Sequence, residues 1–461
     1  MAHERLHIMP SIRTLFKSPA RISLMSFSTL IFIGTLLLML PAAVTGRRLG
    51  LIDALFTATS ASCVTGLSVV DTGSTFTTFG QAVIVGLIQV GGLGIMTLST
   101  LFIMLAGKRP SLTGNELIND TFSHSGIDNI SSMVRRIILV TMAIELGGAA
   151  VMFFRFYPGY PLTTAIWYAV FHSISAFCNA GFSTFSDSFT GFQGDVVVNT
   201  MISLLIILGG IGFIVMFDCF HVLRLKNRRW TRLSLHAKIV LFGSAALLLL
   251  GTALFFFMEM ENTLKGMPPI KQVMVSFFHA VSARTAGFNT VSIGALANET
   301  LFFLMLLMFI GAAPGSCGGG IKVTTALTLI LHGTSRFRGN DHARLFNRTI
   351  PERCIGKAIG VVLLSMLVIF MATMLLLATE LGDVSHIETR GKFLEILFEA
   401  VSAFGTVGLS TGLTGTLSGA GKLIVSMVMF MGRLGPLVIA LGIKRQKIRR
   451  VQYAEENIMI G

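Results

Sequence analysis

The chain has 461 residues, of which 53% are hydrophobic and 13% are charged, and its net charge is +14. A soluble protein of this size could not bury so much apolar surface, so the composition excludes an ordinary soluble domain and indicates a polytopic membrane protein. The basic charge does not indicate nucleic acid binding, because 25 of the 36 Lys and Arg residues lie in five segments that alternate with pairs of apolar runs. These segments are 1–21, 107–137, 224–238, 333–357 and 444–450.

This distribution of basic residues is the positive-inside pattern of membrane proteins. It predicts a multi-pass protein of the plasma membrane with all five segments in the cytoplasm. Both termini, 1–21 and 444–461, are then cytoplasmic, and the number of membrane spans is even. Anionic lipid or an acidic partner could also bind these segments, but membrane orientation explains them without either.

The apolar runs predict outer helices in pairs along the chain, with a shorter helix inside each pair. The expected outer helices lie near 22–44 and 79–106, 134–157 and 196–223, 235–260 and 300–331, and 356–380 and 421–443. The helices between them have only about 10–14 residues, which is too short to cross a bilayer and fits re-entrant segments.

One motif recurs in all four pairs: an apolar stretch with an aromatic residue, a Ser-Ala pair, and then a Gly followed by Leu or Phe. The copies are "LFTATSASCVTGLS" (55–68), "VFHSISAFCNAGFS" (170–183), "FFHAVSARTAGFN" (277–289) and "LFEAVSAFGTVGLS" (397–410), the third with a one-residue gap. A Gly-rich element follows each copy: "IQVGGLGIM", "ILGGIGFIV", "FIGAAPGSCGGGIKV" and "FMGRLGPLV".

Two motifs in the same order predict an all-α membrane protein of four tandem helix–short helix–helix repeats (M1–P–M2) around a central pore, with about eight transmembrane helices. The expected repeats are 22–107, 134–225, 235–333 and 356–443. Two crossings per repeat give all four the same orientation, so they can surround one axis along the membrane normal.

The Gly segments are candidates for a selectivity filter. Irregular backbone at membrane depth is tolerated where it lines a wet cavity, and rings of carbonyl oxygens can replace the hydration shell of a monovalent cation. The candidate filter residues are Val64, Thr65, Gly66, Asn179, Ala180, Gly181, Thr285, Ala286, Gly287, Thr406, Val407 and Gly408. The alternative is that the small residues only allow close helix packing.

A second repeated position lies eight or nine residues before each Gly and holds Thr57, His172, His279 and Glu399. No Cys or carboxylate stands at ligand spacing, so hydrogen bonding that seats the short helices is favoured over metal binding. No metal site is expected beyond the transported ion.

The segment 311–322, "GAAPGSCGGGIK", interrupts an apolar run that could not continue as a helix. It fails as a phosphate-binding loop, because Ile321 stands before Lys322. An unwound loop below the filter could gate conduction, and we assign the gate to Gly311, Pro314, Gly315, Ser316, Gly318, Gly319, Gly320, Lys322 and Arg433. Arg433 is expected to repel cations or to hold this loop; pairing with an acid such as Glu145 is the alternative.

These segments resemble the Trk/Ktr/HKT superfamily of potassium transporters. "IDALFTATSASCVTGLSVVDTG" (52–73) and "SAFGTVGLSTGLT" (402–414) are most similar to the KtrB/KtrD membrane subunits of bacterial Ktr systems. The resemblance implies a homodimer with one pore per chain and a cytosolic ring of nucleotide-binding subunits (KtrA/KtrC-like). It also implies a preference for potassium, since Gly stands at all four filter positions, and a response to sodium in many members.

The sequence therefore predicts a K⁺-translocating subunit without its own cofactor, with K⁺ as substrate and Na⁺ as a candidate activator. The alternative within transport is a Na⁺-conducting or Na⁺/K⁺-coupled transporter. An intramembrane enzyme would need a nucleophile–base or acid pair at membrane depth, and none is evident. A scaffold or receptor would not need four filter segments.

Overall fold

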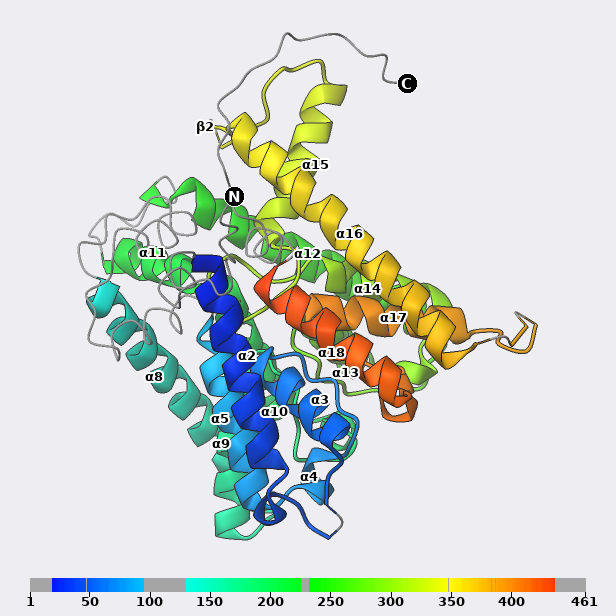
Figure 1. Ribbon diagram of the computed structural model, residues 1–461. Helices are drawn as coiled ribbons and strands as arrows, with labels where there is room; N and C mark the ends of the chain where they lie inside the picture. Colours follow the sequence, from blue (N-terminus) through cyan, green and yellow to red (C-terminus); the bar gives the residue numbers. More distant parts are fainter. Residues whose placement is uncertain are drawn as a thin grey trace, which may run out of the picture.

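The computed structural model describes residues 19–46, 48–94, 130–224, 232–346, 348–382, 384–385 and 387–435. The regular secondary structure of these residues is almost entirely helical (Figure 1). The strands among them are β1 (Arg344–Leu345) and β2 (Arg348–Thr349), which pair antiparallel. The all-α prediction omitted this small hairpin, whose two-residue strands carry no alternating pattern that a sequence could reveal.

Each repeat contains a long first helix, a short helix and a second helix. The first helices are α2 (Pro19–Leu38), α8 (Ile130–Phe156), α12 (Leu235–Glu259) and α16 (Glu352–Glu380). The short helices are α3 (Leu51–Ser62), α9 (Leu162–Phe177), α13 (Pro269–Ser282) and α17 (Lys392–Gly405). The second helices begin with α5 (Thr78–Gly92), α10 (Val196–Ile211), α14 (Asn298–Phe309) and α18 (Gly419–Leu434). Connecting pieces are α4 (Thr72–Thr75) and the 3-10 turns η1 (Pro41–Ala43), η2 (Thr190–Phe192), η4 (Ile293–Ala295) and η5 (Leu413–Thr416).

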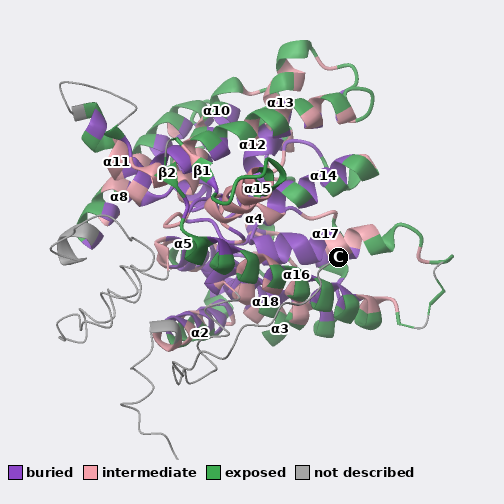
Figure 2. Cartoon of the chain, turned by 90° about the horizontal axis from the view of Figure 1, so that it is seen from above, coloured by how far each residue is buried: buried purple, intermediate pink, exposed green. Residues whose placement is uncertain are grey.

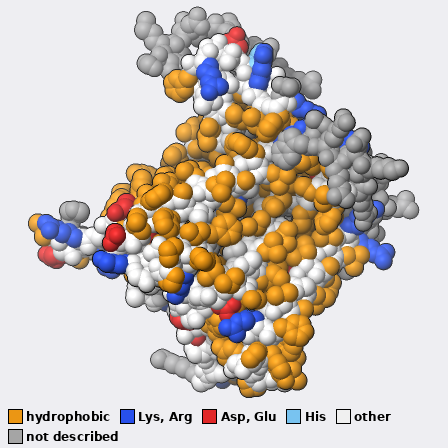
Figure 3. Space-filling model, turned by 180° about the vertical axis from the view of Figure 1, so that it is seen from behind, with side chains coloured by type: hydrophobic (Ala, Val, Ile, Leu, Met, Phe, Trp, Pro, Cys, Tyr) orange, Lys and Arg blue, Asp and Glu red, His pale blue; other side chains and the backbone are white. Residues whose placement is uncertain are grey.

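The first helices are the long apolar helices of the described part of the chain, and the bent pair α10 (Val196–Ile211) and α11 (Phe213–Arg224) is a further candidate span. Segments of four helices are long and apolar enough to cross a bilayer: Arg21–Leu38, Val134–Phe156, Leu235–Glu259 and Glu352–Glu380. Only about a third of each span is buried inside the protein, so most of its apolar surface faces outward. Figure 3 shows this outward surface, on which hydrophobic side chains cover most of one face. Lipid is the medium that such a surface requires.

The second helices are shorter than predicted, and the expectation of one continuous helix over 196–223 is wrong. Helix α10 ends at Ile211, and α11 (Phe213–Arg224) leaves at an angle of 98°. Gly212 lies between them with φ +90°, a conformation that side-chain-bearing residues rarely adopt. A Cβ at this position would lie 2.7 Å from the Pro314 carbonyl oxygen.

In the other repeats, too, the second helix ends at a Gly-rich loop or at a glycine with positive φ. In the third, α14 ends at Phe309 and α15 (Val323–Phe337) begins after the Gly-rich loop, as the sequence predicted. In the first and fourth repeats, Gly94 and Gly435 also have positive φ, +86° and +83°. The predicted continuations 95–106 and 436–443 lie outside the described residues, as do most of the cytoplasmic segments 1–21, 107–137, 224–238 and 444–461.

The short helices form the centre of the molecule. Seen from above, buried residues concentrate toward the middle, and exposed residues lie on the outer helices (Figure 2). The last two turns of α3, α9, α13 and α17 are almost fully buried. With 12 to 16 residues, none of these four helices can span a membrane. Each therefore brings the segment after it to the interior.

Candidate functional site

The four repeated glycines meet in a closed ring at the centre. A Cβ on Gly66 would lie 2.6 Å from the Ala180 carbonyl oxygen, and one on Gly181 would lie 2.8 Å from that of Ala286. The same contact continues around the ring. A Cβ on Gly287 would lie 3.1 Å from the Cα of Gly408, and one on Gly408 would lie 3.0 Å from the Cα of Gly66. Each glycine thus touches the next repeat, and no side chain fits at any of the four positions.

The backbone of the ring is the same in all four repeats. The glycines have φ between +71° and +93°, and the residue two positions earlier is also left-handed. Those earlier residues are Val64, Asn179, Thr285 and Thr406, with φ +56°, +59°, +77° and +48°. Left-handed backbone costs energy in residues with a side chain and persists only where the surroundings impose it. Four equivalent outliers show that the four repeats share one backbone geometry at the ring.

The serines of the Ser-Ala pairs hold each segment against its short helix. The Ser60 hydroxyl accepts a hydrogen bond from Gly66 N at 3.1 Å, and Ser402 accepts one from Gly408 N at the same distance. In the other two repeats the serine donates instead, from Ser175 to the Phe182 carbonyl at 2.7 Å and from Ser282 to that of Phe288. These serines were part of the quoted motif, but the sequence did not reveal their role.

The third copy of the motif has one residue fewer than the others, and the chain makes up for it between the short helix and the ring. Ala286 N bonds to the Ser282 carbonyl across four residues, whereas the corresponding bonds in the other copies span five. The third segment therefore reaches the same conformation with one residue fewer.

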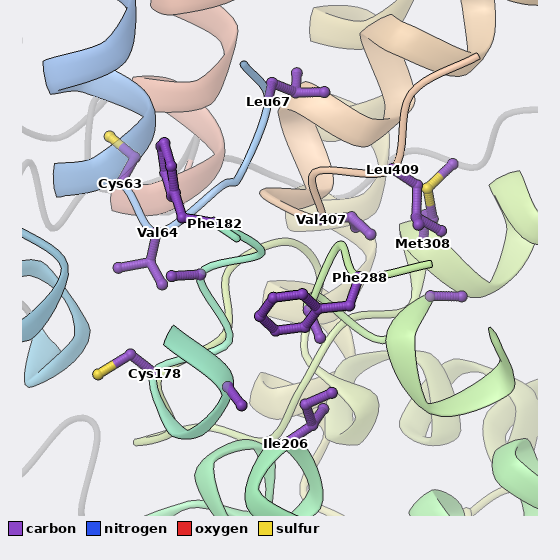
Figure 4. Close-up of a cluster of buried hydrophobic side chains, with 14 of the residues drawn as sticks. Cys63, Val64, Leu67, Cys178, Phe182, Ile206, Phe288, Met308, Val407 and Leu409 are labelled. Carbon is purple, nitrogen blue, oxygen red and sulfur yellow. The ribbon is translucent and has the colours of Figure 1, made fainter. Parts of the chain in front are cut away.

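Bulky residues after each glycine fix the ring to the core. Leu67, Phe182, Phe288 and Leu409 are each at most 1% exposed. Figure 4 labels all four side chains, which leave their ring segments for the surrounding cluster of buried side chains. The Leu or Phe of the motif therefore serves packing, while the backbone before it faces the other segments.

The position eight or nine residues before each Gly plays two different roles. His172 Nε2 lies 3.0 Å from the Ser183 hydroxyl, and Glu399 accepts a hydrogen bond from Thr414 at 2.8 Å. Both side chains join the short helix to the segment that follows the ring, as predicted. Thr57 donates to the Asp53 carbonyl of its own helix, and His279 Nδ1 lies 3.0 Å from the Val275 carbonyl, also of its own helix. In the second and fourth repeats, side-chain hydrogen bonds from this position thus reach the segment after the ring.

The Gly-rich loop lies directly against the ring. A Cβ at Gly318 would overlap the side chain of Thr285, and one at Gly319 would overlap that of Thr406. The loop is also held by backbone bonds to the second repeat, from Ala313 N to Gly210 O at 3.0 Å and from Cys317 N to Gly209 O at 3.1 Å. Since the loop touches two ring segments, its small residues are a requirement of space.

Arg433 ties the loop to two other repeats. From α18 in the fourth repeat, its guanidinium donates to the Cys317 carbonyl of the loop and to the Gly91 carbonyl of α5. The alternative pairing with Glu145 is not what the structure shows, because the Glu145 carboxylate accepts from Gln89 at 3.0 Å. The contact with the loop was one of the two expectations for Arg433.

Lys322 closes the loop on itself, because its amine donates to the Gly318 carbonyl at 2.7 Å.

In the ring segments, the buried hydroxyls of Thr65 and Thr406 have no hydrogen-bond partner among the described residues. Buried hydroxyls of native proteins are normally satisfied, so two such groups in the ring indicate a site for an ion or water.

Close helix packing is what the sequence predicts for the downstream glycines such as Gly91 and Gly209, but it does not identify the short helices as their partners. A Cβ at Gly91, Gly209 or Gly432 would overlap the carbonyl of Ser62, Phe177 or Phe404, near the end of a short helix. The signal was present, because these glycines occupy one position of the repeated downstream element. It was read as general helix packing.

Comparison with known proteins agrees with this geometry. Residues 10–448 match the family model described as TrkH, cation transport protein. The chain is 40% identical to the Ktr system potassium uptake protein B of Bacillus subtilis, over 96% of this chain and 97% of that protein. It is 35% identical to the potassium/sodium uptake protein NtpJ of Enterococcus hirae, over 96% and 97% of the two chains.

The fold also has a solved counterpart. The crystal structure of the potassium transporter TrkH from Vibrio parahaemolyticus superposes with a TM-score of 0.75, covering 96% of this chain and 87% of that one at 18% identity. These matches extend over nearly the whole chain, beyond the repeated motifs alone. The chain is therefore a polytopic, all-helical membrane protein that belongs to the TrkH family of cation transport proteins, within the Trk/Ktr superfamily.

Proposed function

We propose that this chain is the ion-translocating subunit of a Ktr-type potassium uptake system. The observation that carries the proposal is the closed ring of four left-handed glycines, each preceded two residues earlier by another left-handed residue. Such a backbone can aim successive carbonyls at one axis and replace the water around a weakly hydrated cation. A membrane potential negative inside supplies about 2.3 kcal/mol per charge per 100 mV, which is enough for passive uptake.

The loop 311–322 acts as the gate in this proposal. The loop lies against Thr285 and Thr406, and from there it would obstruct the path of an ion that leaves the ring. Arg433 holds the loop in place and sets a positive charge near that path. Conduction then requires the loop to move away from the ring.

The names of the relatives support the assembly that the sequence predicts. A Ktr system membrane subunit would form a homodimer and meet a cytosolic nucleotide-binding ring at the basic segments. In this proposal both termini are cytoplasmic, and the four repeats have the boundaries expected from the sequence.

A Na⁺-conducting or Na⁺/K⁺-coupled transporter is the second candidate. It is favoured by the relative NtpJ, which is named a potassium/sodium uptake protein and is 35% identical to this chain. The same ring would then accept Na⁺, or a sodium ion would act as an activator.

Cation flux into liposomes that contain the purified chain tests both candidates, with K⁺, Rb⁺ and Na⁺ as permeants. The decisive variant is Gly66→Ser, because its side chain would meet the Ala180 carbonyl and Gly181. We expect the wild type to favour K⁺ and Rb⁺ and the variant to lose on the order of tenfold in K⁺/Na⁺ discrimination.

Gly86→Ser is the matched control, since it lies in α5 of the same repeat and no atom stands within 4 Å of an added Cβ. Equal Na⁺ and K⁺ flux through the wild type would favour the second candidate. If a chain shortened by residues 314–319 still carried no cation, the transport proposal would be wrong.

A further inference from the structure

Arg284 is a buried cation that the transport site does not use. It follows helix α13 directly before Thr285 of the ring, and only 9% of its surface is exposed. One guanidinium nitrogen donates to the Ser244 hydroxyl of α12 at 3.1 Å. Its Nε is buried and has no hydrogen-bond partner among the described residues.

No acidic side chain compensates this charge in the described part of the chain. None of the salt bridges found there includes Arg284, and its one side-chain partner is a neutral hydroxyl. The carboxyl end of α13 offers a partial negative charge of about half a unit. A full charge at membrane depth normally needs an opposite charge or several strong acceptors.

A cavity of about 20 Å³ adjoins this guanidinium. Its polar side chains are those of Arg284 and Ser244, and its walls include Ile207 and Leu248 of helices α10 and α12. Ala312 of the Gly-rich loop forms another part of the wall. The cavity thus lies between the second and third repeats and touches both the gate segment and the residue before the ring.

We propose that this cavity binds a small monovalent anion, which neutralises Arg284. A cavity of this volume has room for about one water molecule, so it admits a halide ion or one oxygen of a carboxylate group. Arg284 lines the cavity and supplies the positive charge and the charged donor that such an anion requires. Two sources share this chemistry: chloride from solution, and the carboxylate of a fatty acid whose chain lies between α10 and α12.

The site couples the anion to the transport elements by position. A ligand in the cavity contacts Ala312 on one side and Arg284, the neighbour of Thr285, on the other. Its presence therefore stabilises the arrangement in which the loop lies against the ring. Binding itself requires no transport, so it can be measured on a chain that conducts nothing.

Direct binding to the full chain in lipid nanodiscs tests the proposal, with radioactive chloride as one probe and a photoactivatable fatty acid as the other. We expect one of the two probes to bind saturably, with one site per chain. Arg284→Gln should weaken that binding at least about tenfold, since the charged donor is lost. Arg155→Gln is the control, because Arg155 pairs with Asp195 near an exposed helix end.

A second variant, Leu248→Trp, keeps Arg284 and fills the cavity, so it separates loss of the site from loss of the fold. Saturable chloride binding that both variants weaken identifies a free anion. Fatty acid cross-linked to α10 or α12, and displaced in both variants, identifies a lipid carboxylate. Absence of saturable binding of either probe to the wild type, or unchanged binding in Leu248→Trp, would overturn the proposal.

Discussion

Arg433 shows how one side chain can connect three repeats. Its guanidinium bonds to carbonyls of the third and first repeats from a helix of the fourth, and the side chain is 8% exposed. A buried cation that donates to carbonyls holds its partners more firmly than a neutral donor would. The position of the loop therefore depends on this residue.

Replacing Arg433 with Gln should release the loop. Gln can reach one carbonyl at most, so we expect Rb⁺ flux into liposomes to rise severalfold and the folded state to lose about 2–3 kcal/mol. Arg433→Lys keeps the charge and one bond and should show a smaller rise. Lower flux in Arg433→Gln than in the wild type, with normal folding, would contradict the role of Arg433 as a restraint.

The serine tethers are the second feature at the scale of single residues. Ser402→Ala leaves Gly408 N without its acceptor inside the protein, which costs about 1–3 kcal/mol for a buried amide. We expect poorer K⁺/Na⁺ discrimination, because the ring backbone loses a restraint. The measurement is the ratio of Rb⁺ to Na⁺ flux.

Ser426→Ala is the control for this tether. Ser426 is also nearly buried, but its hydroxyl bonds only to the Lys422 carbonyl in its own helix. It should leave discrimination unchanged. If both variants changed the flux ratio equally, the tether would have no special role.

At the scale of elements, the break after α10 is the main departure from the expected helices. The run 196–223 is mostly apolar, and its periodicity gives no sign that the helix divides. The break is imposed by tertiary contact: Gly212 lies against the Pro314 carbonyl, and Phe213 N bonds to the Gly315 carbonyl at 3.1 Å. The loop of the third repeat thus packs against the second repeat at the point where α10 ends and α11 begins.

Gly212→Ala should therefore disturb the loop. Alanine is strained at φ +90° and would overlap Pro314, so we expect lower thermal stability and greater access to Cys317, which is 1% exposed. Thiol labelling in a Cys354→Ser background measures this access, because Cys354 is the exposed cysteine.

Gly147→Ala is the matched control, with open space around an added Cβ inside helix α8. There alanine should raise stability by about 0.5–1 kcal/mol, since it favours a helix more than glycine does. Equal labelling of Cys317 in wild type and Gly212→Ala would show that the loop does not depend on the break.

At the scale of the whole molecule, the repeats were predictable because two motifs recur in one order. Sequence placed Gly66, Gly181, Gly287 and Gly408 at equivalent positions, and the structure brings these four together. It could not supply the cyclic order of the contacts or the Arg284 cavity, because both depend on how separate repeats pack. The sequence shows only one trace of the break at Gly212. Gly212 is the fourth residue of "GGIG", and a glycine stands at the same place in "GGLG" of the first repeat and "GRLG" of the fourth.

Closure of the ring requires the first and fourth repeats to meet, although they are farthest apart in the chain. One ion pair joins them directly: Lys422 Nζ of α18 lies 2.7 Å from the Asp53 carboxylate of α3, across 369 positions of sequence. The two side chains are 17% and 30% exposed, so solvent screens the pair only in part. It should hold the last repeat against the first.

A charge swap tests this closure. Asp53→Lys and Lys422→Asp should each lower stability by about 1–2 kcal/mol, because each sets like charges side by side. The double variant restores opposite charges and should recover at least half of the summed loss. Thermal unfolding in nanodiscs measures all four proteins. Losses that simply add in the double variant would mean that the pair does not connect the repeats, and that other contacts, such as the glycine ring and the bond from Arg433 to the Gly91 carbonyl, close the molecule.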